Sequence, residues 1–122
     1  MTELLPEMIT SLPLIETPSD SIKGHLIQGE SNQSVYFIVK AGTFLPEHSH
    51  AAQWGIVIDG EFEITYADKT YIYRKGDTYF VPEGTPHSGK YITDVVSFDV
   101  FDDNSKFKMK FDNIRESLKT AL

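Results

Sequence analysis

Hydrophobic and polar side chains alternate along much of the chain. In the stretch 61–66, Phe62, Ile64 and Tyr66 alternate with polar residues, which is the period of a β-strand that buries one face. Similar short runs recur between residues 22 and 101. We expect strands at 22–28, 34–40, 54–58, 61–66, 70–74, 78–81 and 92–101. Many short strands separated by turns predict an all-β sandwich or barrel.

Turn residues stand between the expected strands. Asp59-Gly60 is a preferred two-residue connection, so the runs 54–58 and 61–66 are expected to form a hairpin. Residues 67–69 and 75–77 predict two further turns. Tight turns with positive φ favour glycine. We expect this conformation at Gly60, Gly76 and Gly84.

Both ends of the chain depart from the strand pattern. Prolines interrupt any long helix before residue 21, although Leu14 and Ile15 can form a short edge strand. Near the C-terminus, Ile114 and Leu118 lie at helical spacing, which predicts a short amphipathic helix. The expected organisation is a lead-in over 1–21, a barrel over 22–104 and an amphipathic C-terminal segment over 105–122.

Composition narrows the possible partners. A chain of 122 residues suits one domain, and its net charge of -7 without a basic cluster argues against nucleic-acid binding. The absence of cysteine excludes thiolate nucleophiles and Cys-ligated metals, and it favours a cytoplasmic location. The first residues are acidic and unlike a signal peptide, and no apolar run has the length to cross a bilayer.

Two histidines with one residue between them are the first candidate for chemistry. If residues 48–50 are extended, His48 and His50 point to the same face, where two imidazoles can share one metal ion. The alternative interpretation is a pair of surface histidines on a strand. His25 stands apart from this pair and is expected to be a partly exposed strand histidine.

A second stretch, ending at His87, favours the metal-site interpretation over a pair of surface histidines. Together the two stretches resemble the paired motifs of the cupin family: Gly, five residues, His-x-His, then a Gly further on; and Gly, five residues, Pro-x-Gly, two residues, His. The matching positions are Gly42, His48, His50, Gly60, Gly76, Pro82, Gly84 and His87. The resemblance implies a single small jelly-roll β-barrel, here with a short C-terminal helix, that binds one divalent metal ion.

The sequence departs from the family motifs at two positions. Gln53 stands where the family has a glutamate ligand, and Tyr91 replaces the final asparagine. The implied ligand set is His48, His50, His87 and Gln53, and the ion is zinc, nickel, manganese or iron. Alternatively, Gln53 hydrogen-bonds in the outer shell while water completes the coordination.

The last expected strand carries the candidates for proton transfer. Asp99 and Phe101 resemble an Asp-x-Phe of small cupins that act on unsaturated uronic acids, the pectin-degradation type. There a basic residue a few positions later holds the substrate carboxylate, whereas here Lys106 is reached with no arginine before it. Asp99 can equally face solvent. Five aromatic residues can line a pocket or simply pack: Tyr36, Trp54, Tyr71, Tyr73 and Tyr79.

These observations favour a Lewis-acid enzyme of the isomerase, tautomerase or lyase type. Its expected ligand is a small sugar-derived or carboxylate molecule. The alternatives are an iron-dependent dioxygenase and a sugar-binding protein without catalysis, because the fold alone does not choose between them. Exposed sheet edges in so small a barrel predict a homodimer, with contacts through the lead-in and the C-terminal helix.

Overall fold

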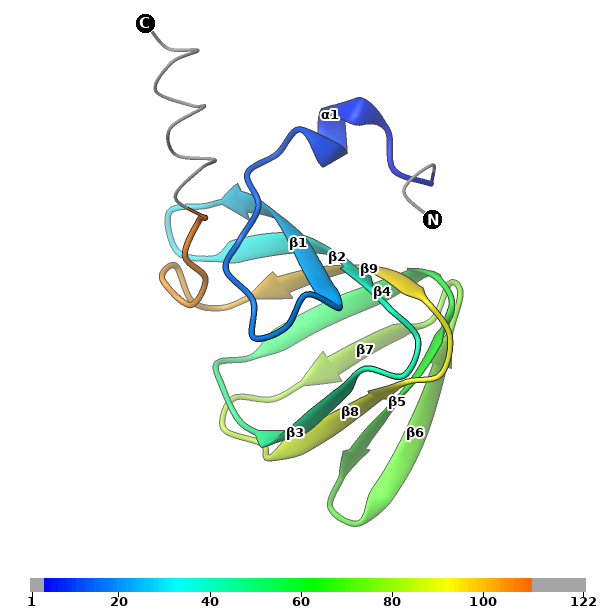
Figure 1. Cartoon of the computed structure of the whole chain (residues 1–122). Helices are drawn as coiled ribbons and strands as arrows, with labels where there is room; N and C mark the ends of the chain where they lie inside the picture. The colour runs from blue at the N-terminus through cyan, green and yellow to red at the C-terminus, as the bar shows by residue number, and fades with distance from the viewer. Residues whose placement is uncertain (1–3, 111–122) are drawn as a thin grey trace, which may run out of the picture.

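Two antiparallel sheets face one another in the computed structural model, which describes residues 4–110 (Figure 1). The elements are α1 (Glu7–Thr10), β1 (Ile22–Gln28), β2 (Gln33–Val39), β3 (Phe44–His48), β4 (Gln53–Asp59), β5 (Glu61–Tyr66), β6 (Lys69–Arg74), β7 (Thr78–Val81), β8 (His87–Tyr91) and β9 (Val95–Phe101). The five-stranded sheet has the order β1-β2-β9-β4-β7, and the four-stranded sheet has the order β3-β8-β5-β6. This jelly-roll arrangement confirms the predicted all-β class.

Three strands have the bounds that alternation predicted: β1, β5 and β7. Alternation did not mark β8, which has a glycine at its centre, or β3, where Pro46 interrupts the run. Proline lacks an amide hydrogen, so it is tolerated mainly on edge strands. Accordingly, β3 is an edge strand of its sheet.

The connection at Asp59-Gly60 is not the expected hairpin. β4 pairs with β7 and β9, whereas β5 pairs with β6 and β8. The turn therefore carries the chain from one sheet to the other. Gly60 has φ of 95°, and a Cβ there would overlap the carbonyl oxygen of Asp94. The glycine signal was correct, but the pairing partners of a strand depend on contacts that a turn dipeptide does not specify.

Three other turns also contain residues with positive φ. Ala67 and Asp68 both have positive φ between β5 and β6, which is the two-residue geometry that matches the twist of a hairpin. Gly76 and Gly84 have φ of 89° and 73°. The positive φ predicted for these glycines and for Gly60 is therefore confirmed.

Part of the lead-in lies beside β1, the edge strand of the five-stranded sheet. Leu14 and Ile15 form only isolated bridges, to His25 and Met109 respectively, instead of an edge strand. The C-terminal helix expected from Ile114 and Leu118 lies outside the described residues. No helix within residues 4–110 has the length and hydropathy needed to span a membrane.

Two hydrophobic clusters fill the space between the sheets. One contains Val57, Phe62, Ile64, Tyr79 and Val95; the other contains Ile15, Leu26, Val35 and Phe101. Members of both clusters line a single cavity of about 170 Å³. The sheets are therefore not packed solid throughout, and the candidate site lies in that cavity.

Candidate metal centre

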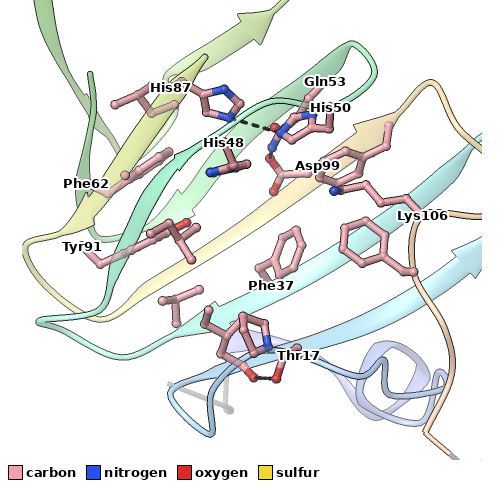
Figure 2. A pocket seen from close by; sticks show the side chains of 18 of the residues that line it. Thr17, Phe37, His48, His50, Gln53, Phe62, His87, Tyr91, Asp99 and Lys106 are labelled. Carbon is pink, nitrogen blue, oxygen red and sulfur yellow. Dashed lines mark hydrogen bonds between the residues drawn. The ribbon is translucent and has the colours of Figure 1, made fainter. Parts of the chain in front are cut away.

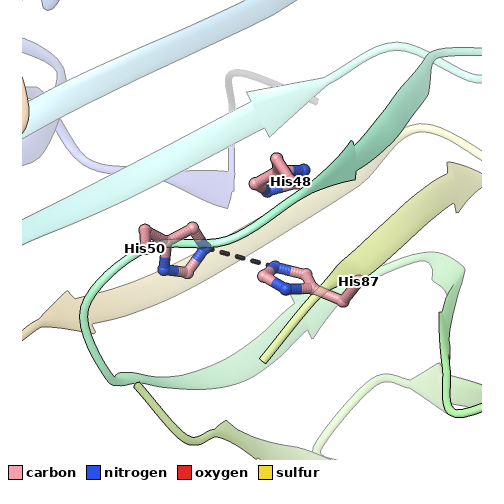
Figure 3. Close-up of side chains that lie close together, drawn as sticks. All are labelled: His48, His50 and His87. Atoms are coloured by element: carbon pink, nitrogen blue, oxygen red, sulfur yellow. Dashed lines mark hydrogen bonds between the residues drawn. The ribbon is translucent and has the colours of Figure 1, made fainter. Parts of the chain in front are cut away.

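Three histidines from two separate parts of the chain gather at the cavity (Figure 3). His48 ends β3 and is paired in register with His87, the first residue of β8. His50 follows two residues after the end of β3. One ring nitrogen from each histidine lies within 4.8 Å of the others. This group can hold a metal ion.

Backbone carbonyls fix the orientation of all three rings. His48 Nδ1 lies 2.8 Å from the carbonyl oxygen of Pro46, and His87 Nδ1 lies 2.8 Å from that of Thr85. His50 Nδ1 lies 2.7 Å from the carbonyl oxygen of Ala51. A carbonyl oxygen can only accept, so each Nδ1 carries the hydrogen. In a neutral ring, the lone pair then sits on Nε2.

The Nε2 atoms of His50 and His87 are only 3.2 Å apart. Burial lowers the pKa of His50 to about 4 and also lowers the pKa of His87, so both rings are neutral near pH 7. Two lone pairs then face each other without a proton between them. Imidazole nitrogens about 2.0–2.1 Å from one metal ion stand roughly 3 Å apart. The residues present therefore fit a divalent cation.

Strand alternation was not what brought His48 and His50 together. β3 ends at His48, and the ring centroids of the two histidines are 5.3 Å apart. The amide of Gly84 donates to the carbonyl oxygen of His50 at 2.9 Å. This bond ties the loop that carries His50 to the Pro82–Gly84 turn that precedes His87. The turn therefore helps to set the geometry of the site.

Asp99 points into the barrel and is 1% exposed, so the solvent-facing alternative is wrong. Its carboxylate accepts hydrogen bonds from Ser97 Oγ at 2.7 Å, Gln53 Nε2 at 2.9 Å and the Tyr79 hydroxyl. Burial raises the pKa of Asp99 to about 6, against the opposing effect of these donors. Because a carboxylate accepts from the amide nitrogen, the Gln53 amide oxygen must face away from Asp99.

Gly55 is a structural requirement of this cluster that sequence reasoning did not single out. A Cβ at Gly55 would overlap both the Tyr79 ring and the Asp99 carboxylate. The missing side chain is what lets the Tyr79 hydroxyl reach Asp99. A glycine inside an otherwise hydrophobic strand was the available signal, because such glycines often mark a close approach.

Polar side chains gather in one part of the cavity, and much of the remaining lining is apolar. Figure 2 shows the three histidines, Gln53 and Asp99 close together, with Phe62 beside the histidines and Phe37 and Thr17 farther from them. Of the five aromatic residues proposed from sequence, Tyr79 lines the cavity. Trp54 is 40% exposed, and Tyr36 packs on Phe98 at a centroid distance of 4.5 Å.

Two other basic side chains differ from their sequence expectations. Lys106 lines the cavity. Its Nζ lies 5.8 Å from the ring centre of Phe101 and 5.3 Å from that of Phe107. The sequence predicted no role for this lysine, because the family resemblance implies an arginine. His25 is 5% exposed, so the expectation of partial exposure is wrong. Its Nδ1 lies 2.9 Å from the carbonyl oxygen of Leu12, and it is not part of the histidine group.

Comparisons with known proteins agree with this architecture. The family model described as a cupin domain matches residues 35–101. KdgF from Halomonas sp. is 20% identical with a TM-score of 0.67, covering 75% of this chain and 87% of its own. An RmlC-like cupin from Shewanella frigidimarina is 22% identical with a TM-score of 0.68, covering 77% and 86%.

A third solved structure belongs to a much longer protein. Oxalate decarboxylase of Bacillus subtilis, in a structure concerned with its Mn(II) centres, is 24% identical with a TM-score of 0.61. The match covers 77% of this chain and 30% of that one. No match was found among curated proteins. At these identities the structural matches establish the fold alone.

Proposed function

This chain belongs to the cupin family, since the family match spans more than half of its length, and from that premise we propose that it is a metal-dependent enzyme. The reaction is of the isomerase, tautomerase or lyase type, on a small carboxylate or sugar-derived substrate. The observation that carries the proposal is a set of three imidazoles, each held through Nδ1 by a backbone carbonyl of Pro46, Ala51 or Thr85, with one ring nitrogen of each within 4.8 Å of the others.

The ligands in this proposal are His48, His50 and His87 through Nε2, and Gln53 through its amide oxygen. All four are neutral, so an ion bound there keeps its full positive charge. A bound divalent ion would supply Lewis acidity, polarising a carbonyl or enolic oxygen of the substrate. The chain's own part is to preset the rings, because each Nδ1 already has its backbone partner.

Asp99 is the proposed proton carrier. It is the buried carboxyl among the residues that line the cavity, and Ser97 and Tyr79 hold its two oxygens in place. Phe101 cannot exchange a proton, so its proposed part is positioning. Its ring packs edge-on against His50 at a centroid distance of 5.5 Å.

The reaction class can be tested with metal-loaded protein and a panel of keto acids, enolic acids and sugar acids. Proton exchange with solvent at a carbon next to a carbonyl, followed by NMR in D₂O, would support isomerase or tautomerase chemistry. Oxygen uptake with any panel member would favour the dioxygenase alternative instead. Saturable binding without turnover or exchange across the panel would favour the non-catalytic alternative.

The role of Gln53 can be separated from that of Asp99. Gln53→Ala is expected to weaken Mn²⁺ binding at least about tenfold, because a ligand oxygen is lost. Ser97→Ala is the matched control, since it also removes one hydrogen bond to Asp99 but no proposed ligand; it is expected to leave the affinity within about twofold. Isothermal titration with Mn²⁺ measures both. Equal weakening in the two variants would mean that Gln53 acts only through Asp99.

We also propose that two copies of the chain associate, and we place the contact on the outer face of the five-stranded sheet instead of on the lead-in and the C-terminal helix expected from the sequence. Alternate residues of β2, β4, β7 and β9 form a face without charged side chains: Ser34, Tyr36, Trp54, Ile56, Thr78, Phe80, Phe98 and Val100. Phe80 is 57% exposed and Trp54 is 40% exposed. A chain of net charge -7 meets its own copy with least repulsion on an uncharged face.

Phe80→Glu is expected to convert the dimer into a monomer, because it would place two carboxylates in an apolar interface. Light scattering should show the mass falling from twice 13.8 kDa to 13.8 kDa. Ile72→Glu on β6, where Ile72 is 44% exposed, is the control and should leave the dimer intact. A monomeric parent protein would contradict the proposal.

A further inference from the structure

We propose that Asp99 is a positioning residue for Gln53. It takes the amide NH₂ group, turns the amide oxygen toward the histidines, and excludes a charged ligand from position 53. This inference rests on the proposed function, because it concerns the fourth ligand of the same centre. Two features carry it: the register of β4 with its neighbouring strands, and the direction of the hydrogen bond between the two side chains.

The register of β4 between β7 and β9 places the two side chains on one face of the sheet. Gly55 is paired with Asp99 on one side and with Tyr79 on the other. Gln53 precedes Gly55 by two residues, so its side chain points to the same face. A Cβ at Gly55 would lie closer than 3.0 Å to Asp99. The missing side chain therefore leaves room for the Asp99 carboxylate diagonally opposite Gln53.

The hydrogen bond between Gln53 and Asp99 runs in one direction (Figure 2). Gln53 Nε2 donates to Asp99 Oδ1 at 2.9 Å, and it is the only hydrogen bond of the Gln53 side chain within residues 4–110. A carboxylate can only accept. With the amide reversed, its oxygen would face the carboxylate and its NH₂ group, which is a donor, would face the histidines. Asp99 therefore selects the orientation in which Gln53 can act as a ligand.

The other contacts of Asp99 hold its carboxylate in place. The Tyr79 hydroxyl also donates to Oδ1, and Ser97 Oγ donates to Oδ2 at 2.7 Å. The Tyr79 ring is itself packed on Phe62 at a centroid distance of 5.3 Å. A carboxylate has about four acceptor sites, and these two donors with Gln53 fill three of them. The remaining site, on Oδ2, is compatible with the proton transfer proposed for Asp99.

The same contact accounts for a neutral residue at position 53. A carboxylate there would attract a cation more strongly than an amide does. Beside Asp99, however, it would bring two like charges to the 2.9 Å separation that a hydrogen bond now spans. Because Asp99 is 1% exposed, solvent would screen this repulsion only weakly. The negative charge next to the centre thus belongs to Asp99, and the ligand in contact with it stays neutral.

The test exchanges the two groups. Gln53→Glu combined with Asp99→Asn moves the carboxylate to position 53 without changing the net charge, and the new amide can donate to it. Urea unfolding of metal-free protein and titration calorimetry with Mn²⁺ compare the parent, both single variants and the double variant. Gln53→Glu alone should unfold at a lower urea concentration and bind Mn²⁺ no more tightly than the parent. The double variant should recover the urea midpoint and bind Mn²⁺ at least about tenfold more tightly than Gln53→Glu.

Glu16→Gln is the matched control, since Glu16 is the other carboxyl group at the cavity and is exposed. Combined with Gln53→Glu, it removes the same charge as Asp99→Asn but should restore neither stability nor Mn²⁺ affinity. Equal rescue by the two changes would overturn the inference. So would a Gln53→Glu variant that is as stable as the parent and binds Mn²⁺ more tightly. If Gln53→Glu does not fold alone, circular dichroism of the two double variants measures the rescue.

Failure of the proposed function gives a different pattern. A parent protein that binds none of Mn²⁺, Zn²⁺, Ni²⁺ and Fe²⁺, while Asp99→Asn still rescues the urea midpoint of Gln53→Glu, would overturn the metal centre. The pairing of Asp99 with a neutral residue 53 would then stand. Conversely, Mn²⁺ binding by the parent without any rescue by Asp99→Asn would overturn the positioning role of Asp99 and leave the metal centre standing.

Discussion

Replacing His87 by alanine is expected to weaken Mn²⁺ or Zn²⁺ binding by more than about a hundredfold. Changes to outer-shell partners alone cost about 10–100-fold in metal affinity, and this change removes a ligand outright. It also removes one of the two Nε2 atoms that face each other at 3.2 Å. Folding should survive, because the backbone at position 87 can still pair with His48 in the sheet.

Calorimetric titration of metal-free protein measures the effect, and circular dichroism checks the fold. The control is His25→Asn, which changes the fourth histidine while keeping a donor for the carbonyl of Leu12. Its metal affinity should match that of the parent protein. If His87→Ala bound metal as tightly as the parent, or if His25→Asn lost binding to the same degree, the three-histidine centre would be wrong.

The strands could be predicted where one face of the sheet is buried and the other is exposed to solvent. β5 shows this clearly, since Phe62 and Ile64 are buried between partly exposed neighbours. β3 and β8 were missed because Pro46 and Gly89 interrupt their patterns and because both strands also line the cavity. Side chains that line a cavity include polar ones, so His48, His87 and Ser88 replace the hydrophobic residues that a core strand would show.

The local sequence pattern did not predict the sheet to which each strand belongs. Asp59-Gly60 permits a tight turn, but whether β5 then pairs with β4 or crosses to β8 depends on the packing of residues about 30 positions later. The sequence did identify the three histidines, since the spacing of both motifs was legible. It could not orient Asp99, because the face it occupies depends on the register of β9 between β2 and β4.

Lys106 was missed for a related reason. The family resemblance implies an arginine soon after Asp99, whereas in the structure a lysine reaches the cavity. The segment after β9 is irregular, and it brings Phe107 beside Gln33. The Gln33 side chain donates a hydrogen bond to the carbonyl oxygen of Phe107 and accepts one from its amide. This path brings Lys106 back over Phe101. No periodicity in the sequence encodes such a path.

Gly55→Ala is expected to destabilise the protein by about 2–6 kcal/mol, and it tests whether the Asp99 cluster holds the barrel together. Overpacking a core costs about 1–3 kcal/mol, and the new methyl group would lie closer than 3.0 Å to both Tyr79 and Asp99. Pushing these two side chains apart also leaves a buried hydroxyl or carboxylate without its partner, which costs about 1–3 kcal/mol.

The matched control is Gly89→Ala on β8, another glycine inside a strand. A Cβ there would meet its nearest neighbours at 3.8–4.0 Å, which is ordinary contact. Its free energy of unfolding should stay within about 0.5 kcal/mol of the parent value, because such a change adds no strain. Urea unfolding followed by tryptophan fluorescence measures both variants. Equal stability of the two would show that β4 and β9 can shift apart at Gly55, so the close packing of Tyr79 on Asp99 would not constrain the site.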